Sequence, residues 1–290
     1  MTSPTVVIPH DEWTLSPEFG GERAYFAQQG NGVFRPEPSA VGRDDGMLSG
    51  PAVAALVAST LERKYGAVGF TPARLTMDLL KPARTVATRT QTRLIRHGQR
   101  TRTAECDVMQ DDWIVARATL LQYRCSAAPL GEQWNPERGF TPPQTADGDL
   151  LYLSSDDSHW SPMGVGHHNA GHKRAYYRGP DAVAGLAATP FVRAVIVAAA
   201  STNLVTNLGS NGIGYLSGDL TVALTRSPRS DFIGVQADTR CSADGLSVGC
   251  ATLFDEMGAF GTAMVTAMAD PAARIEAGSG TVPVGQHPQS

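Results

Sequence analysis

The sequence predicts an α+β protein made of two similar halves, in each of which an antiparallel sheet wraps around one long helix. Two segments, 49–66 and 189–209, are apolar on nearly every side, whereas a surface helix shows a single apolar stripe. Strand-like segments follow each of them in the same order and at similar spacings, as a duplicated unit would. A chain of 290 residues is long enough to form two such cores.

Each predicted helix carries residues that mark its start and its end. Ser49 and Thr189 are candidate N-caps, and a proline follows each of them within two residues. Gly66 and Gly209 stand where the two helices should stop. Because both helices are apolar on most sides, each must be covered on most sides.

Alternation of apolar and polar residues with a period of two predicts the strands that cover the helices. In the first half these strands are 22–33, 70–81, 85–96, 101–109 and 113–124. In the second half they are 171–178, 213–225, 232–241, 247–254 and 260–269. One strand before a buried helix and a meander after it pack most economically when the sheet curls around the helix. The predicted fold is therefore a double hotdog, with the two sheets paired edge to edge.

Composition and punctuation set the expected domain bounds. The N-terminal hotdog is predicted to span 1–125 and the C-terminal hotdog 150–270. Between them, 126–149 is rich in proline, glycine and polar residues and is expected to be a linker of low order. The last stretch, 271–290, has too little apolar content to fold and is expected to be a flexible tail.

The totals exclude several classes of function. A formal charge of −4 offers no basic field for a nucleic acid, and no basic cluster with interleaved aromatics occurs. The longest apolar runs have seven residues, against the roughly 20 that cross a bilayer, and the start of the chain is unlike a secretory signal. The four cysteines show no CxxC spacing and are expected to be reduced thiols. We therefore expect a soluble, cytoplasmic protein without nucleic-acid or membrane partners.

Motifs in both halves resemble the acyl-CoA thioesterase II family and its thioesterase-like relatives, over roughly residues 20 to 270. In the first half the resemblance lies in an Ala-rich helix that starts with Gly-Pro, in "PARLTMDLLKPA" and in "RTRTAECDVMQDDWIVARATLLQ". In the second half it lies in "AAASTNLVTNLGSNGIGYLSGDLTVALTRSP", "FIGVQADTR" and "DGLSVGCATLFDEMGAFGTA". The resemblance implies hydrolysis of acyl-CoA thioesters to free acid and CoA, with an acyl tunnel between the halves. It implies no cofactor, since the CoA moiety enters with the substrate.

In that family an Asp, a Thr and a Gln of the second half hold the nucleophilic water. Two acids of the family pattern compete for the Asp role, and the one at the head of a strand falls on Asp219. The other, late in the helix, falls on Thr202 or Asn203, neither of which is acidic. The Thr position falls on or near Thr239, and the Gln position falls close to Thr266. The chain thus departs from the pattern at the helical acid and at the Gln.

Thioester hydrolysis needs a general base for the water and a donor for the developing oxyanion. Asp219 is the expected base, and Thr239 is expected to point inward because it is in phase with the apolar residues of its strand. The donor is expected among the free amides at a helix start, at Gly50 or in the first turn after Thr189. Gly50 and Thr202 are the expected substrate-binding residues. The arginines that could bind the anionic CoA are Arg74, Arg93, Arg96 and Arg226.

Other features leave alternatives open. The pair Asp44–Asp45 is a rival acid site before the first helix, and Asp78 is out of phase with its strand and expected to face solvent or the other half. His167, His168 and His172 are expected to form an exposed loop and not a metal site, because no acid or cysteine stands at a ligand spacing.

Two further reaction classes are disfavoured, and one rival function is not. No histidine lies in either predicted helix, as a hotdog hydratase would need, and no GxSxG elbow supplies a nucleophilic serine. The rival to the hydrolase is a non-catalytic paralogue that binds acyl-CoA or another acyl thioester. Exposed strand edges would allow a homo-oligomer.

Overall fold

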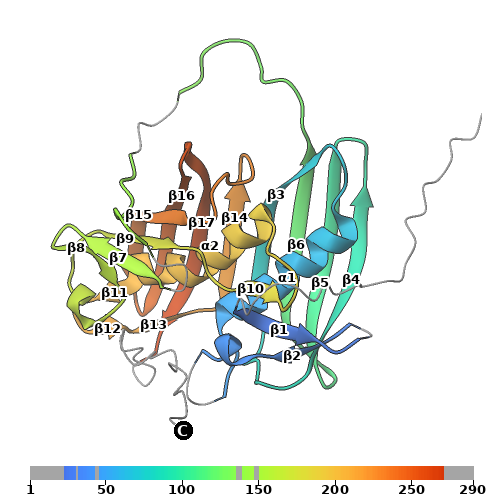
Figure 1. The fold of residues 1–290 in the computed structure, drawn as a ribbon, viewed down its shortest axis with the longest axis horizontal. Helices are drawn as coiled ribbons and strands as arrows, with labels where there is room; N and C mark the ends of the chain where they lie inside the picture. The colour runs from blue at the N-terminus through green and yellow to red at the C-terminus, as the bar shows by residue number, and fades with distance from the viewer. Residues whose placement is uncertain (1–22, 31, 43–45, 135–138, 147–149, 271–290) are drawn as a thin grey trace, which may run out of the picture.

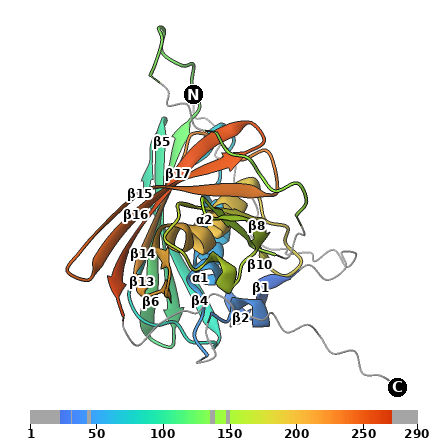
Figure 2. The ribbon, with the colours of Figure 1, turned by 90° about the vertical axis from the view of Figure 1, so that its left-hand side faces the viewer.

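Two α-helices lie inside one large curved sheet in the computed structural model of the protein (Figure 1). The structure describes residues 23–30, 32–42, 46–134, 139–146 and 150–270. The predicted tail 271–290 and the rival acids Asp44–Asp45 lie outside the described residues. Seen from the side, the strands form a bent outer layer and the two helices lie within the bend (Figure 2). The architecture is a mostly sheet α+β fold.

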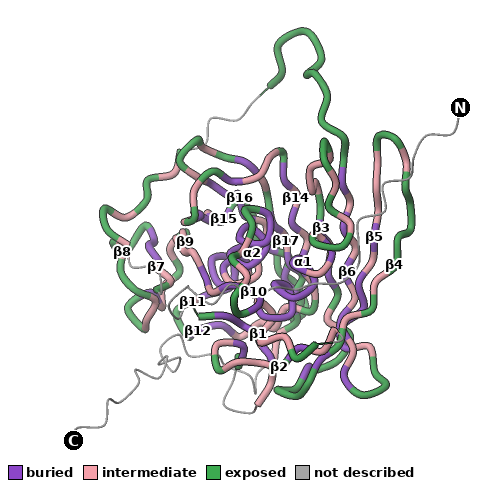
Figure 3. Tube along the Cα trace, turned by 45° about the vertical axis from the view of Figure 1, so that its right-hand side comes forward, coloured by how far each residue is buried: buried purple, intermediate pink, exposed green. Residues whose placement is uncertain are grey.

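The two helices begin where the sequence predicts. Helix α1 spans Gly50–Tyr65 and helix α2 spans Pro190–Asn207. Ser49 Oγ accepts a hydrogen bond from the Ala52 N–H at 3.3 Å, and Thr189 Oγ1 accepts one from the Val192 N–H at 3.2 Å, so both N-cap predictions are confirmed. Both helices are buried over most of their length and contact each other in one core (Figure 3).

The strands fall into two sets, one around each helix. The set around α1 comprises β1 (Ala24–Gln28), β2 (Val33–Pro36), β3 (Phe70–Leu79), β4 (Thr88–His97), β5 (Thr101–Gln110) and β6 (Trp113–Arg124). The set around α2 comprises β7 (Tyr152–Ser155), β8 (Ser158–Pro162), β9 (Lys173–Tyr177), β13 (Tyr215–Ser217), β14 (Asp219–Leu224), β15 (Ile233–Ala243), β16 (Leu246–Asp255) and β17 (Gly258–Ala269). The short strand β10 (Asp181–Val183) precedes α2. A small hairpin of β11 (Leu208–Gly209) and β12 (Gly212–Ile213) follows α2.

The two sets join into one sheet at β3 and β14. These strands pair antiparallel, and Asp78 stands directly opposite Asp219. Outward from the joint, the order β3-β6-β5-β4 on one side corresponds to β14-β17-β16-β15 on the other. At the far edge of the first set, β10 pairs in parallel with β1, so the segment before α2 extends the sheet around α1.

Three predictions from the sequence differ from the structure. The single strand expected over 22–33 is two strands, β1 and β2, which pair antiparallel. The single strand expected over 213–225 is divided, because the pairing of β13 and β14 with β17 shifts by one residue at Gly218. Part of the expected low-order linker is packed. The Phe140 ring stacks on Phe254 with 5.1 Å between ring centroids, and Trp160 Nε1 donates to Thr141 O at 3.0 Å. Residues 139–146 therefore lie against the second half.

Candidate functional site

Asp219 and Thr266 are neighbours in the structure. Asp219 begins β14, and Thr266 lies beside it on β17. Oδ1 of Asp219 accepts two hydrogen bonds from Thr266, one from the backbone N–H at 2.6 Å and one from Oγ1 at 2.8 Å. Two donors on one carboxylate oxygen hold the orientation of the Asp219 side chain.

This pair lies on the outer face of the sheet. Leu220 and Val265 are buried in the core against the helices, and successive side chains of a strand point to opposite faces. Asp219 and Thr266, one position away from these residues, therefore point away from α1 and α2. Their common face also carries Asp78, as expected for a residue out of phase with the core side of its strand.

Thr239 does not join this pair. The register of β15 against β16 shifts between Ala237 and Thr239, so Ala237 lies opposite the core residue Ala251 but Thr239 lies opposite Cys250. The expectation that Thr239 points inward is wrong, because this bulge reverses the alternation of faces, and the residue is exposed. Strands β16 and β17 separate β15 from β14, which amounts to roughly 14 Å along the sheet.

The helical position offers no acid in this protein. Thr202 is fully buried, and its Oγ1 donates to Ala198 O at 2.7 Å within the same helix. Asn203 is part-buried and donates from Nδ2 to Tyr215 O at 3.1 Å. The buried hydroxyl of Ser201 has no hydrogen-bond partner among the described residues. This stretch of α2 is polar but uncharged.

Gly50 lies at the helix side of the joint between the halves. It begins α1, and a Cβ added to it would meet Leu79 Cδ1 at 4.0 Å. The Leu79 N–H in turn donates to Gly218 O, just before Asp219. Leu79 thus links the start of α1 to the residue before Asp219, whereas the Asp219 side chain points to the opposite face of the sheet.

A cavity of about 330 Å³ opens at the end of α2. Its walls are Val205–Gly209, the loop 170–172 and the segment Ala237–Arg240, which includes Thr239. Asn207 organises the polar side of this cavity, since its Oδ1 accepts from Arg240 Nε at 3.1 Å and from Ser247 Oγ at 2.7 Å. Arg240, opposite Gly249, is the residue of this segment that reaches α2.

The segment 167–174 is held by hydrogen bonds within itself and to strand β8. His167 is buried, with Nδ1 3.1 Å from Ser158 Oγ and Nε2 2.9 Å from Ser161 Oγ, so the expectation of an exposed loop is wrong for this residue. Buried Lys173 donates from Nζ to Asn169 O at 2.6 Å.

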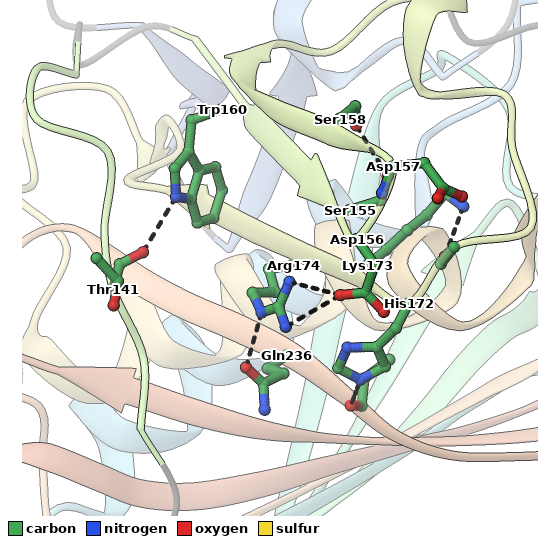
Figure 4. Close-up of polar contacts among 12 residues, drawn as sticks. Thr141, Ser155, Asp156, Asp157, Ser158, Trp160, His172, Lys173, Arg174 and Gln236 are labelled. Carbon is green, nitrogen blue, oxygen red and sulfur yellow. Dashed lines mark hydrogen bonds and ion pairs between the residues drawn. The ribbon is translucent and has the colours of Figure 1, made fainter.

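His172 and Arg174, the chain neighbours of Lys173, contact the adjacent strands (Figure 4). Arg174 contacts Asp156 and Gln236, and His172 Nε2 donates a hydrogen bond to Ala237 O. Across the described ranges, no three His, Cys, Asp or Glu side chains are grouped so as to hold a metal ion. Two of the candidate arginines are engaged in ion pairs, Arg93 with Glu105 and Arg226 with Asp255.

One carboxylate that the sequence did not suggest lies between the helices. Glu62, near the end of α1, accepts a hydrogen bond from Oγ1 of Thr189, the N-cap of α2. Burial raises the pKa of the Glu62 carboxyl, and the hydrogen bond from Thr189 offsets part of that rise. Its position in the helix could have drawn attention to it. Glu62 follows the N-cap Ser49 by thirteen residues, and Thr202 follows the N-cap Thr189 by the same number.

The fold is shared with solved structures of low sequence identity. A hot dog fold protein of Alicyclobacillus acidocaldarius matches with a TM-score of 0.60 at 13% identity, over 86% of this chain and 96% of that one. A tesB protein of Mycobacterium avium subsp. paratuberculosis matches with a TM-score of 0.61 at 15% identity, over 85% and 96%. The acyl-CoA thioesterase II TesB2 of Mycobacterium marinum matches with a TM-score of 0.61 at 12% identity, over 84% and 95%. The chain therefore has the hotdog fold.

Models of protein families identify the family of the sequence. The model of the acyl-CoA thioesterase N-terminal domain matches residues 42–123, and that of the C-terminal domain matches residues 126–268. No curated protein matches the chain. Together the two models cover most of the sequence, and the protein belongs to the acyl-CoA thioesterase family.

Proposed function

We propose that the protein is a double hotdog that hydrolyses acyl-CoA thioesters to free acid and CoA. The observation that carries this proposal is the match of two thioesterase domains in tandem, one containing α1 and the other α2. The joint of β3 with β14 supports the arrangement as two hotdogs side by side. The boundaries proposed for the halves are 1–125 and 150–270.

The proposed chemistry is attack of an activated water on the thioester carbonyl. Asp219 is the base that the family resemblance implies, with Thr266 fixing its Oδ1. Its other oxygen, Oδ2, has no hydrogen-bond partner in the described part of the chain and is available to a water. Because both residues lie on the outer face, this assignment requires the thioester to reach that face. Thr239 lies at the cavity, with β16 and β17 between its strand and that of Asp219, and has no part in this step.

Removal of single carboxylates tests this assignment. Asp219→Asn keeps the shape of the side chain and removes its charge, and we expect it to lower thiol release by at least about 100-fold with acyl-CoA substrates. Asp78→Asn is the matched control, because Asp78 lies directly opposite on the same face. Loss of activity in Asp219→Asn alone supports Asp219 as the base. Equal activity of both variants and the wild type rejects this role and leaves the reaction in place.

A second function is favoured by Thr202. The family pattern has an acid at Thr202 or Asn203, and Thr202 is fully buried with its hydroxyl bonded to the helix backbone. A protein that binds an acyl thioester without cleaving it would tolerate this residue. For this function we expect no thiol release from any acyl-CoA between acetyl-CoA and palmitoyl-CoA, together with a rise in melting temperature on adding one of them.

The conditions of action are also proposals. The cysteines of the described chain are Cys106, Cys125, Cys241 and Cys250, and all are free thiols, which supports a reducing compartment such as the cytoplasm. Within the described ranges, no helix combines the length and apolarity that crossing a membrane requires. We propose acyl-CoA as the substrate, no added cofactor, and association of copies through free strand edges as a further property.

A further inference from the structure

Positive charge is concentrated at one end of the first set of strands. Three segments form this end: 63–74, which joins α1 to β3, 96–104, which contains the turn from β4 to β5, and 120–128, where β6 ends. None of the three contains an Asp or a Glu, although the whole chain has a formal charge of −4. Their cations are Arg63, Lys64, Arg74, Arg96, Arg100, Arg102 and Arg124. Such a cluster creates a local positive potential on an otherwise acidic protein.

Strand pairing brings two of these arginines to the face of the sheet that is turned toward α1. Arg102 stands opposite Gln122, and Arg124 stands opposite Phe70. Gln122 is buried, and its Nε2 donates to Tyr65 O at the end of α1 at 3.1 Å. Because opposite residues share a face, and so do residues two apart on one strand, Arg102 and Arg124 lie on the same face as Gln122.

Both guanidinium groups are held against one aromatic ring. Cζ of Arg102 lies 4.6 Å from the centroid of the Phe70 ring, and Cζ of Arg124 lies 4.8 Å from it. Arg102 Nη2 donates to His97 Nε2 at 2.6 Å, and Arg124 Nε donates to Gln99 O at 2.7 Å. These contacts fix two cations beside each other before any ligand binds.

No acid of the described residues neutralises this pair. Neither Arg102 nor Arg124 forms an ion pair with a carboxylate in that part of the chain. Nε of Arg102 is buried and has no hydrogen-bond partner there. Two fixed cations without a counter-ion repel each other, and an anion bound between them offsets that repulsion.

The second half has a single, better satisfied cation in the corresponding place. When "LTMDL" and "LTVAL" are superposed, Tyr215 takes the position of Phe70. Cζ of Arg240 lies 5.4 Å from the centroid of the Tyr215 ring. Its Nε donates to Asn207 Oδ1 at 3.1 Å, and its Nη1 donates to Ser242 Oγ at 2.9 Å. The pair of arginines around one ring is thus a property of the first half, and packing against the ring does not require it.

We propose that Arg102 and Arg124 form a binding site for phosphate esters, with Arg96 and Arg100 on the exposed turn beside it. Guanidinium groups offer paired N–H donors that match the oxygens of a phosphate, and charge-assisted hydrogen bonds of this kind are strong. The phosphates of CoA and those of free diphosphate compounds share this chemistry.

The site stands apart from the proposed base. Phe70 and Asp78 lie near opposite ends of β3, and Asp219 stands directly opposite Asp78. Eight residues of strand separate the two positions by roughly 26 Å. The inference therefore goes beyond the proposed hydrolysis and does not depend on it.

Titration calorimetry of the full-length protein with CoA and with pyrophosphate tests the site. We expect binding to the wild type, and we expect Arg102→Gln and Arg124→Gln each to weaken it by at least about tenfold. Arg35→Gln is the matched control, because it removes an exposed arginine from β2, which pairs with the other end of β4. Pantetheine, which has no phosphate, should behave alike with the wild type and with all three variants.

The outcomes identify the source of the phosphate or reject the site. Tighter binding of CoA than of pyrophosphate, with the difference lost in both variants, identifies CoA as the ligand. Pyrophosphate binding at least as tight identifies free phosphate compounds. If neither probe binds, if Arg102→Gln and Arg124→Gln bind as the wild type does, or if Arg35→Gln weakens binding equally, the site is rejected, whatever the thioesterase assay shows. Arg124 is exposed, so Arg124→Gln decides the case even if Arg102→Gln does not fold.

Discussion

Gly249 allows α2 to lie against β16, and an alanine there should push the helix away. A Cβ at Gly249 would lie 2.6 Å from Thr206 Cβ and 2.8 Å from Thr206 Cγ2. Thr206 is buried, and its Oγ1 is bonded to Thr202 O at 2.7 Å, so its side chain has little freedom to move aside. Overpacking of this kind costs about 1–3 kcal/mol. The melting temperature should fall by roughly 2–4 °C for each kcal/mol lost.

The cause can be isolated with a double-mutant cycle followed by thermal and urea unfolding. Thr206→Gly removes the atoms that the new Cβ would meet, at a cost of its own that the single variant measures. In that background Gly249→Ala should cost close to nothing. Gly214→Ala is the matched control, because a Cβ there meets nothing within 4 Å, and it should be neutral or stabilising. Equal destabilisation by Gly249→Ala in both backgrounds would falsify the packing argument.

Two other predictions concern buried charge. Asp181 accepts a hydrogen bond from Nη2 of buried Arg193 at 3.4 Å. Asp181→Ala should therefore lower the free energy of unfolding, measured by urea titration, by about 3–5 kcal/mol. An unchanged value would contradict a dominant role for this ion pair. Burial lowers the pKa of His167 from its ordinary value of 6.5 in the folded protein. As the pH falls, the imidazole of the unfolded chain is therefore protonated before that of the folded protein, and the free energy of unfolding should fall below about pH 6.5. His167→Asn should show a smaller fall between about pH 8 and pH 5, and an identical fall would reject this origin.

Local features of the chain were sufficient to predict the frame of the fold. N-cap hydroxyls act on amides three residues away, so Ser49 and Thr189 could be recognised without any tertiary information. The same holds for β6, predicted and observed over Trp113–Arg124, where every second residue from Ala116 to Gln122 is buried. Contacts within a few residues decide these elements.

The candidate site depends on relations that alternation alone does not contain. The faces of Thr239 and Arg240 are exchanged by one extra residue in β15, and the sequence "ADTRC" carries no mark of that bulge. The docking of Phe140 on the second half depends on space above Gly234, where a Cβ would overlap the Phe140 ring. Glu62 and Thr189 are 127 positions apart and meet only because the two helices pack together.

Burial explains why an acid would persist at one of the two equivalent helix positions and not at the other. An ionised carboxylate in the place of fully buried Thr202 would lose its hydration with no cation to replace it among the buried groups nearby in α2, which are Ser201, Thr206 and Asn207. Glu62 avoids this cost because it is half-buried and bonded to an exposed hydroxyl. Uncharged side chains at the α2 position therefore stabilise the core, whereas the α1 position, which is open to solvent on one side, tolerates a carboxylate.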